Sequence, residues 1–168
     1  TRNVLTEAAR ICRGDVVDLA GVSADELDGL ILPGGFGAAK NLSDFALKGD
    51  ACSVHPEVSR LVLAMLDAKK PVGAVCIAPA VVAAILRDAG RSGSLTVGLA
   101  QGENQGVGEA IEAMGITHAA CPVTEVREDA ELGLVSTPAY MEAGRISEAA
   151  AGIEALVARI LELAAAPA

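Results

Sequence analysis

The chain has 168 residues, long enough for one domain with a substantial core, and its 22 acidic against 13 basic residues give a net charge of −9. This acidic balance argues against a nucleic-acid partner, which needs a basic footprint, and against an anionic membrane surface. No apolar run is long enough to span a bilayer and no signal peptide is evident, so we expect a cytoplasmic protein.

The core and the cysteines set further bounds. Apolar residues make up 52% of the chain, but only two phenylalanines and one tyrosine are aromatic, which predicts an aliphatic core. The four cysteines form no C-x-x-C pair and no zinc-type pairing with histidine. We therefore expect no metal, no cofactor and no disulfide framework, and a reducing compartment. Cys12, Cys52 and Cys121 are interpreted as packing residues or bystanders.

Along the chain, helix-type and strand-type patterns alternate, which is typical of an α/β domain. In the first half, the capping-box spacing of Ser23 and Glu26 predicts a brief helix over 24–28, and Pro56 begins an amphipathic helix. The apolar face expected for that helix consists of Val58, Leu61, Val62, Met65 and Leu66. The other elements expected are a helix reaching Cys12, strands over 15–19 and 29–32, and a short helix over 38–47.

The second half continues the alternation without an internal repeat or a linker, so we expect one domain over residues 1–168. A charged turn around Glu128 and Asp129 is predicted to join two strands, and the final helix carries an apolar stripe. That stripe consists of Ile146, Ala150, Ile153, Val157 and Ile160. The elements expected are strands over 71–75, 95–99, 117–123 and 132–136, helices over 78–89, 107–114 and 143–164, and a polar loop over 102–106.

The strand-to-helix turn at Cys76 is the first candidate for chemistry. An apolar strand runs into Cys76, and Ile77-Ala78-Pro79 leads into a helix. Ligands of open α/β sheets bind at the carboxyl ends of such strands, and a helix amino terminus favours a thiolate over a thiol. The alternative is that Cys76 is a small buried hydrophobe, as free cysteines often are.

A glycine-rich turn gives the second candidate. The strand that ends at Pro33 is followed by Gly34-Gly35-Phe36-Gly37, which lets the backbone turn sharply and approach another group. In a parallel sheet this turn opens on the same edge as Cys76, so its amides could form an oxyanion hole. The alternatives are a structural turn without a ligand and a phosphate cradle. Neither dinucleotide nor P-loop spacing is present, which excludes those two kinds of phosphate site.

These two turns carry a family resemblance. The segments Pro33 to Ser43 and Cys76 to Pro79, with Arg2 to Ile11 and Ser136 to Met141, resemble the isoprenoid-biosynthesis amidotransferase-like (ElbB-like) group of the ThiJ/PfpI superfamily. The resemblance covers nearly the whole chain. It implies a flavodoxin-like three-layer α/β/α sandwich, similar to class I glutamine amidotransferases, and a homodimer.

The resemblance also implies site residues and an activity. Cys76 takes the position of the reactive cysteine, and Gly34, Gly35 and Ile77 take those whose amides form the oxyanion site. We expect a glutathione-independent glyoxalase that converts a small aldehyde substrate, such as methylglyoxal or glyoxal, to a hydroxyacid. The alternatives are a non-catalytic redox sensor or stress-response protein, and a deglycase or hydrolase that uses the same cysteine.

Three departures from the family pattern limit this expectation. The sequence lacks the strand-helix-strand unit that would precede Thr1 and carry a glutamate bonded to the cysteine, so we expect little catalysis from these 168 residues alone. Ile77 stands where many superfamily members have histidine. The H-x-E string of true glutamine amidotransferases is absent, which argues against glutaminase activity.

The remaining candidates are single residues. His118, at the start of a predicted strand, is a candidate catalytic base, with a surface or supporting position as the alternative. Asn41 and Tyr140 are candidate substrate-binding residues, as is Lys40, although ordinary loop packing fits each of them equally well. His55 precedes Pro56 and is interpreted as a helix cap.

Overall fold

The computed structural model describes residues 2–99 and 101–166, and its centre is a four-stranded sheet. The strand order is β1-β2-β6-β5, in which β1–β2 and β2–β6 are parallel and β5–β6 is antiparallel. A second, parallel pair joins β3 to β4. The strands are β1 (Leu30–Leu32), β2 (Val72–Val75), β3 (Ser94–Leu95), β4 (Thr117–His118), β5 (Arg127–Asp129) and β6 (Leu134–Thr137).

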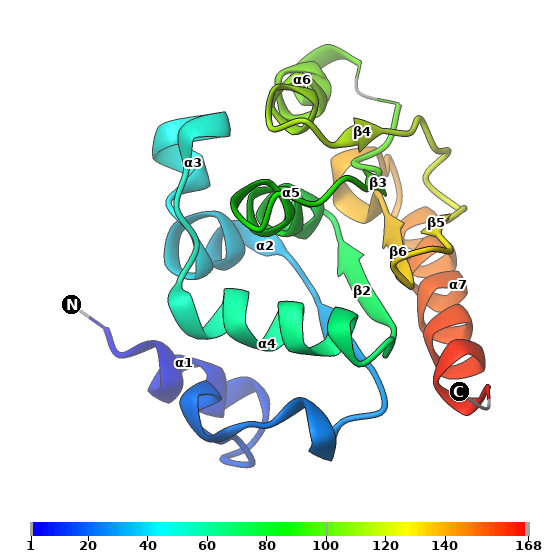
Figure 1. Ribbon diagram of the computed structural model, residues 1–168. Coiled ribbons are helices and arrows are strands. Elements are labelled where there is room, and N and C mark those ends of the chain that lie inside the picture. The colour runs from blue at the N-terminus through cyan, green and yellow to red at the C-terminus, as the bar shows by residue number, and fades with distance from the viewer. Residues whose placement is uncertain (1, 100, 167–168) are drawn as a thin grey trace.

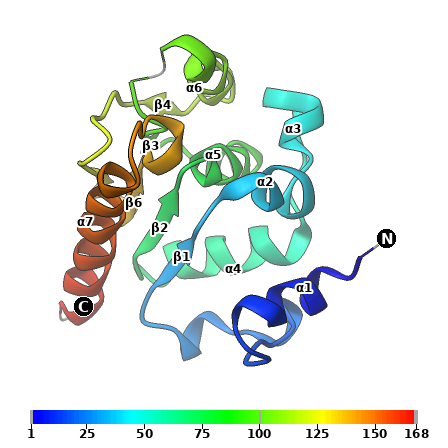
Figure 2. The same cartoon turned by 180° about the vertical axis from the view of Figure 1, so that it is seen from behind.

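Helices cover both faces of the central sheet (Figures 1 and 2). Helices α4 and α5 pack against β2 from one side, and α7 packs against β2 and β6 from the other. The three layers confirm the predicted flavodoxin-like α/β/α sandwich. The α-helices are α1 (Val4–Ile11), α2 (Gly35–Gly37), α3 (Phe45–Lys48), α4 (Pro56–Asp67), α5 (Ala78–Asp88), α6 (Gln105–Ala113) and α7 (Ile146–Ala165).

Short turns of tighter or wider helix connect these elements. A π-helical turn (Ala38–Leu42) joins α2 to α3, and 3₁₀ turns occupy Leu19–Gly21, Ala24–Glu26, Gly49–Ala51, Gly102–Asn104 and Ala139–Met141. Within the described residues, no helix combines the length and the apolar character that crossing a bilayer requires.

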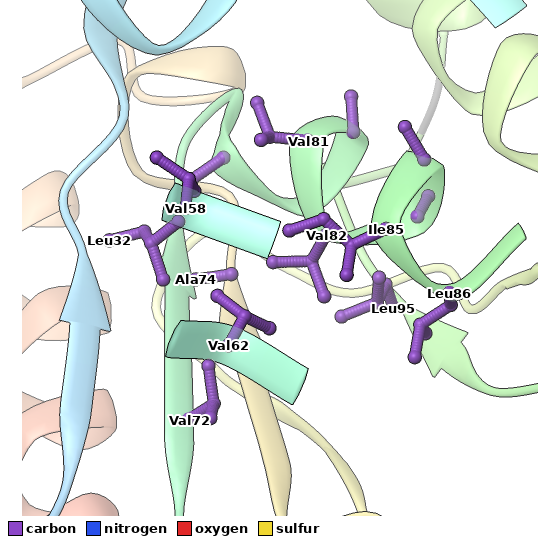
Figure 3. Close-up of a cluster of buried hydrophobic side chains, with 14 of the residues drawn as sticks. Leu32, Val58, Val62, Val72, Ala74, Val81, Val82, Ile85, Leu86 and Leu95 are labelled. Carbon is purple, nitrogen blue, oxygen red and sulfur yellow. The ribbon is translucent and has the colours of Figure 1, made fainter. Parts of the chain in front are cut away.

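The core lies mainly between the sheet and the α4–α5 layer, and it is aliphatic as predicted. Figure 3 shows Val58 and Val62 of α4 gathered with Val82 of α5 beside Val72 and Ala74 of β2. The first nine residues of α5 are all buried. Burial of each valine or larger aliphatic side chain stabilises the fold by roughly 1.5–3 kcal/mol, so α5 is fixed firmly against β2. The turn between β2 and α5 is therefore held at both ends.

Several predicted elements are confirmed in detail. The buried side of α4 consists of the five predicted residues, and His55 caps this helix by accepting the N–H of Glu57 on Nδ1. The capping box of Ser23 and Glu26 is present in full at the 3₁₀ turn that begins at Ala24. In each case short-range side-chain chemistry decides the local structure, which is why sequence reasoning finds it.

Three elements differ from the expectation in the first half and at the charged turn. Residues 15–19 form no strand, because Asp18 accepts the N–H of Ala20 and begins a 3₁₀ turn. The expected helix over 38–47 is broken at Ser43, whose hydroxyl donates to the Ala38 carbonyl. The charged turn is instead strand β5, whose edge position leaves Glu128 free to pair with Arg159 of α7.

The later elements differ in length and in face. The strands expected over 95–99 and 117–123 have two residues each, and the loop expected over 102–106 is a 3₁₀ turn followed by α6. On α7, Ile146 and Val157 of the predicted stripe are exposed, Ala150 and Ile153 are half-buried, and only Ile160 is fully buried, so the predicted face is rotated from the observed one. The buried face instead includes Gly152, whose added Cβ would lie 2.3 Å from the Val123 carbonyl oxygen. The buried face combines this close backbone contact with the apolar residues Ala149, Leu156 and Ile160.

Candidate active site

Cys76 lies on a sharp turn between β2 and α5, and its backbone adopts a left-handed conformation. Its φ is +62°, which is uncommon for a residue with a side chain and costs of order 1–3 kcal/mol. The N–H of Cys76 donates to the Thr137 carbonyl at 3.0 Å, so the β2–β6 ladder holds this conformation. The half-buried thiol faces a pocket at the carboxyl edge of the sheet. This is the geometry of a nucleophile elbow.

Gly34 packs against this elbow so closely that no side chain fits. A Cβ added at Gly34 would lie 2.4 Å from the Val75 carbonyl oxygen and 3.1 Å from the Cys76 Cβ. It would also lie 3.3 Å from the Ile77 nitrogen, and the φ of Gly34 is +85°. The prediction that the glycine-rich turn and the cysteine turn open on the same edge is confirmed by this contact.

Two backbone N–H groups beside the thiol have no internal partner. Gly35 is the first residue of α2 and Ile77 precedes the first residue of α5, and both line the pocket that contains Cys76. Among the described residues, neither N–H has a hydrogen-bond acceptor. Unpaired N–H groups at helix amino termini attract negative charge, so this pair is suited to an oxyanion.

The pocket around Cys76 has a volume of about 390 Å³ and is lined almost wholly by apolar groups. Phe45 is buried, whereas Phe36 is 76% exposed at the edge of the pocket. The Lys40 Nζ lies 4.9 Å from the centre of the Phe36 ring, a cation–π contact. The lining residues are Gly35, Phe36, Ala39, Phe45, Ala46, Cys76, Ile77 and Met141.

Among the described residues that line the pocket, none other than Cys76 has an ionisable side chain. No aspartate, glutamate or histidine of the described chain takes part in the lining. The pocket therefore supplies a nucleophile, two hydrogen-bond donors and an apolar wall, but no general base.

His118 is not among the residues that line this pocket. It lies on β4, where its Nε2 accepts the N–H of Val97 at 3.3 Å. Burial lowers the pKa of His118 below its usual 6.5, and the charges of Glu112 and Glu142 oppose this shift only in part. The structure thus places His118 as a neutral acceptor that holds the β3 end, which corresponds to the supporting position weighed in the sequence.

The two predicted substrate-binding residues also lie outside the pocket lining. Asn41 belongs to the π-helical turn and lines a surface groove with Arg2 and Glu7 of the α1 region. The wide π turn displaces Asn41 from the position that a regular α-helix would give it. Tyr140 is 63% exposed, and the next residue, Met141, enters the lining in its place.

The other three cysteines occupy different environments. Cys52 and Cys121 are buried, and burial raises the pKa of both thiols. Cys12 is exposed at the end of α1. Among the described residues, no group of three or more histidine, cysteine or acidic side chains is arranged to hold a metal ion.

Phe45 and Met141 are pocket residues that sequence reasoning missed. Phe45 is fixed by its N–H, which donates to the Ser43 hydroxyl at 3.3 Å. Met141 is fixed by its carbonyl, which accepts from the side chain of Asn104. Its neighbour Glu142 accepts the N–H of Leu99 at 3.0 Å. In the turn that carries Met141, the sequence favours Tyr140 as the substrate-binding candidate because aromatic residues are rare in this chain. The residue that lines the pocket is the next one, Met141.

Comparisons with known proteins place the chain in a family. No model of a protein family matches it. A mitochondrial human protein, glutamine amidotransferase-like class 1 domain-containing protein 3, is 45% identical over 97% of this chain and 61% of its own length. The mitochondrial ES1 protein homolog of Rattus norvegicus is 43% identical over 97% of this chain and 62% of its own. The chain therefore spans about three fifths of these relatives.

A solved structure supports the same assignment. An isoprenoid biosynthesis protein with an amidotransferase-like domain from Ehrlichia chaffeensis superposes with a TM-score of 0.84 at 36% identity. The match covers 96% of this chain and 71% of that one. The chain belongs to the class I glutamine amidotransferase-like domain proteins. The cytoplasmic expectation is wrong by this comparison, because the similar human and rat proteins are mitochondrial.

Proposed function

We propose that the chain is an ElbB-like member of this family and a cysteine-dependent glyoxalase, which converts small 2-oxoaldehydes to hydroxyacids without glutathione. One observation carries the proposal: a half-buried thiol at φ +62° shares a pocket with the unpaired N–H groups of Gly35 and Ile77. A nucleophile beside two such donors fits addition to a carbonyl, because the oxygen gains negative charge as the bond forms. The small aldehyde partner and the homodimer stay predictions from the resemblance.

In the proposed reaction, the Cys76 thiolate adds to the aldehyde carbon and forms a carbon–sulfur bond. The carbonyl oxygen becomes an oxyanion that accepts hydrogen bonds from Gly35 and Ile77. A base removes the hydrogen from that carbon and a proton returns to the neighbouring carbon through an enediol, which leaves a thioester. Water hydrolyses the thioester, so the net change is the addition of one water to the 2-oxoaldehyde and the thiol is regenerated.

The proton transfer is the step that the described pocket does not provide for, since no carboxylate or imidazole lines it. A positioned base contributes typically about 10²–10⁴-fold to a rate. We therefore expect the 168-residue chain to add to the aldehyde readily but to turn over slowly. A diffusible base should then substitute for the missing group: the rate should rise linearly with imidazole buffer concentration at constant pH.

The test is conversion of methylglyoxal to lactate, followed by proton NMR in D₂O. An enediol intermediate takes a solvent deuteron at carbon 2 of lactate, whereas a direct hydride shift retains the original proton there. Cys76→Ala should abolish lactate formation, and Cys12→Ala, which removes an exposed thiol outside the pocket, should leave it unchanged. Retention of most of the rate in Cys76→Ala with unchanged circular dichroism contradicts the proposal.

The same lack of a base also favours a second candidate, a redox-sensing thiol without turnover. In that case the Cys76 thiolate attacks hydrogen peroxide, the O–O bond breaks, and sulfenic acid and hydroxide form, so that no aldehyde chemistry is needed. Mass spectrometry after peroxide treatment distinguishes the two. Oxidation at Cys76 together with no lactate at any imidazole concentration supports the sensor, and lactate formation that requires Cys76 supports the enzyme.

A further inference from the structure

The size and the lining of the Cys76 pocket indicate what size and polarity of substrate the pocket fits. The volume of about 390 Å³ falls within the range of pockets that hold drug-sized ligands. Methylglyoxal has only a handful of non-hydrogen atoms, and a water molecule takes a share of about 30 Å³. A substrate as small as methylglyoxal would leave most of this pocket filled by solvent.

The side chains that line the pocket do not suit a polar ligand. Besides Cys76, Gly35 and Ile77, the lining consists of Phe36, Phe45 and Met141 together with Ala39 and Ala46. None of these groups offers a charge or a hydroxyl to a sugar, a phosphate or an amino acid. An apolar wall of this kind gains free energy only when it covers apolar surface of a ligand.

The wall is also held in place before any ligand arrives. The Ser43 hydroxyl receives the N–H of Phe45 and donates to the Ala38 carbonyl, which ties α3 to the π-helical turn. The turn that carries Met141 is fixed by the side chain of Asn104. Because these groups are already ordered, little conformational entropy opposes binding of a matching group.

We propose that the preferred substrates are 2-oxoaldehydes whose second carbon carries an aromatic or branched aliphatic group, rather than glyoxal or methylglyoxal. This inference rests on the proposed function, since it names the substrate class of the same site. The aldehyde carbon reaches Cys76 and the oxyanion donors, and the apolar group lies against Phe45 and Met141. One additional apolar carbon in a fitted pocket changes the kcat/KM ratio between two substrates about tenfold or more. A phenyl group in place of a methyl group adds several such carbons and should change the ratio further.

The first experiment compares kcat/KM for phenylglyoxal and methylglyoxal, with mandelate and lactate as the measured products. We expect kcat/KM to be at least tenfold higher for phenylglyoxal. Met141→Gln keeps the length of the side chain but adds an amide to the wall, and it should reduce this ratio several-fold. Leu47→Gln makes the same chemical change at an 81% exposed residue outside the lining and should leave the ratio unchanged.

The second experiment needs no turnover. Cys76 is alkylated with iodoacetamide or with N-benzyl iodoacetamide, and each rate is divided by the rate for glutathione. Each alkylation forms one carbon–sulfur bond and releases iodide. We expect the benzyl reagent to be favoured several-fold at Cys76 in the wild type, and less so in Met141→Gln.

The two experiments separate the inference from the proposed function. Equal or faster turnover of methylglyoxal, with no benzyl preference, overturns the inference and leaves the glyoxalase proposal standing. A benzyl preference that depends on Met141, with no product from either aldehyde, supports the apolar specificity and overturns the proposed reaction.

Discussion

The floor and the wall of the Cys76 pocket are built on different principles. The floor consists of the elbow and Gly34, which lies so close to the elbow that a Cβ added at Gly34 would come within 2.4 Å of the Val75 carbonyl oxygen. The wall consists of side chains such as Phe36, which is 76% exposed and makes a surface contact with Lys40. The floor therefore depends on conformation and tolerates few substitutions. The exposed part of the wall, at Phe36, depends on side-chain character and can change with little effect on the fold.

Gly34→Ala should disrupt the packing of the glycine turn against the Cys76 elbow and cause the largest loss of stability. The new methyl group would meet the Val75 carbonyl oxygen at 2.4 Å, and backbone on both sides leaves no easy escape. We expect a loss of about 3 kcal/mol or more in the free energy of unfolding, measured by urea denaturation.

Gly35→Ala is the matched control for that clash. Its φ of +75° gives a similar backbone strain, but an added Cβ meets nothing within 4 Å. We expect a loss of only about 1 kcal/mol. An equal loss in the two variants would show that the close approach to the elbow is unimportant.

Cys76→Gly should relieve the backbone strain of the elbow. At φ +62° glycine has no steric penalty, whereas alanine keeps it. We expect Cys76→Gly to be more stable than Cys76→Ala by about 1 kcal/mol in thermal or urea unfolding, although both lack the thiol. If Cys76→Ala were more stable than Cys76→Gly, the left-handed conformation assigned to residue 76 would be contradicted.

Phe36→Ala tests the wall. Because the ring is largely exposed, its loss removes one cation–π contact worth about 0.5–1 kcal/mol and little buried area. We expect a change in unfolding free energy below about 1 kcal/mol, together with a lower benzyl preference in the alkylation of Cys76. A loss as large as that of Gly34→Ala contradicts the division between floor and wall.

His118→Gln should have the smallest effect, confined to acidic pH. Burial lowers the pKa of the folded His118 below 6.5, so the unfolded chain binds the proton more tightly. The stability contributed by the neutral ring is therefore present above pH 6.5 and is lost as the pH falls below it. Glutamine can still accept the Val97 N–H without titrating. The fall in melting temperature from pH 7.5 to 5.5 should be smaller in the variant, and an equal fall contradicts the assignment.

The floor could be predicted from the sequence, whereas most of the wall could not. Cys76, Ile77 and the glycine pair sit at the ends of apolar strands, and parallel strands bring such ends together by topology alone. Met141 is positioned at the pocket by a hydrogen bond from Asn104, and Phe45 by a hydrogen bond to Ser43. The apolar and glycine patterns of the sequence predict neither bond.

The errors in the elements have two physical origins. Strand β5 is rich in charge because it is an edge strand, and the charges that suggested a turn are satisfied by Arg159 and by backbone N–H groups. Asn41 lies outside the predicted site because residues 38–42 form a π-helical turn instead of a regular helix. The prediction at β5 failed because long-range contacts decide its backbone. The predictions over 15–19 and 38–47 failed because Asp18 and Ser43 bond to backbone groups a few residues away and compete with the expected strand and helix.

The reactivity of the Cys76 thiol is best measured by competition among the four thiols for limiting iodoacetamide, with peptide mapping to locate the label. Cys12 is the meaningful competitor, because it is exposed while Cys76 is half-buried. Burial raises the pKa of Cys52 and Cys121, which slows both. We expect Cys76 to be labelled first, in spite of its lower exposure, because it alone among the four cysteines lies at a helix amino terminus beside unpaired N–H donors. Labelling of Cys12 ahead of Cys76 in the folded protein would contradict this expectation.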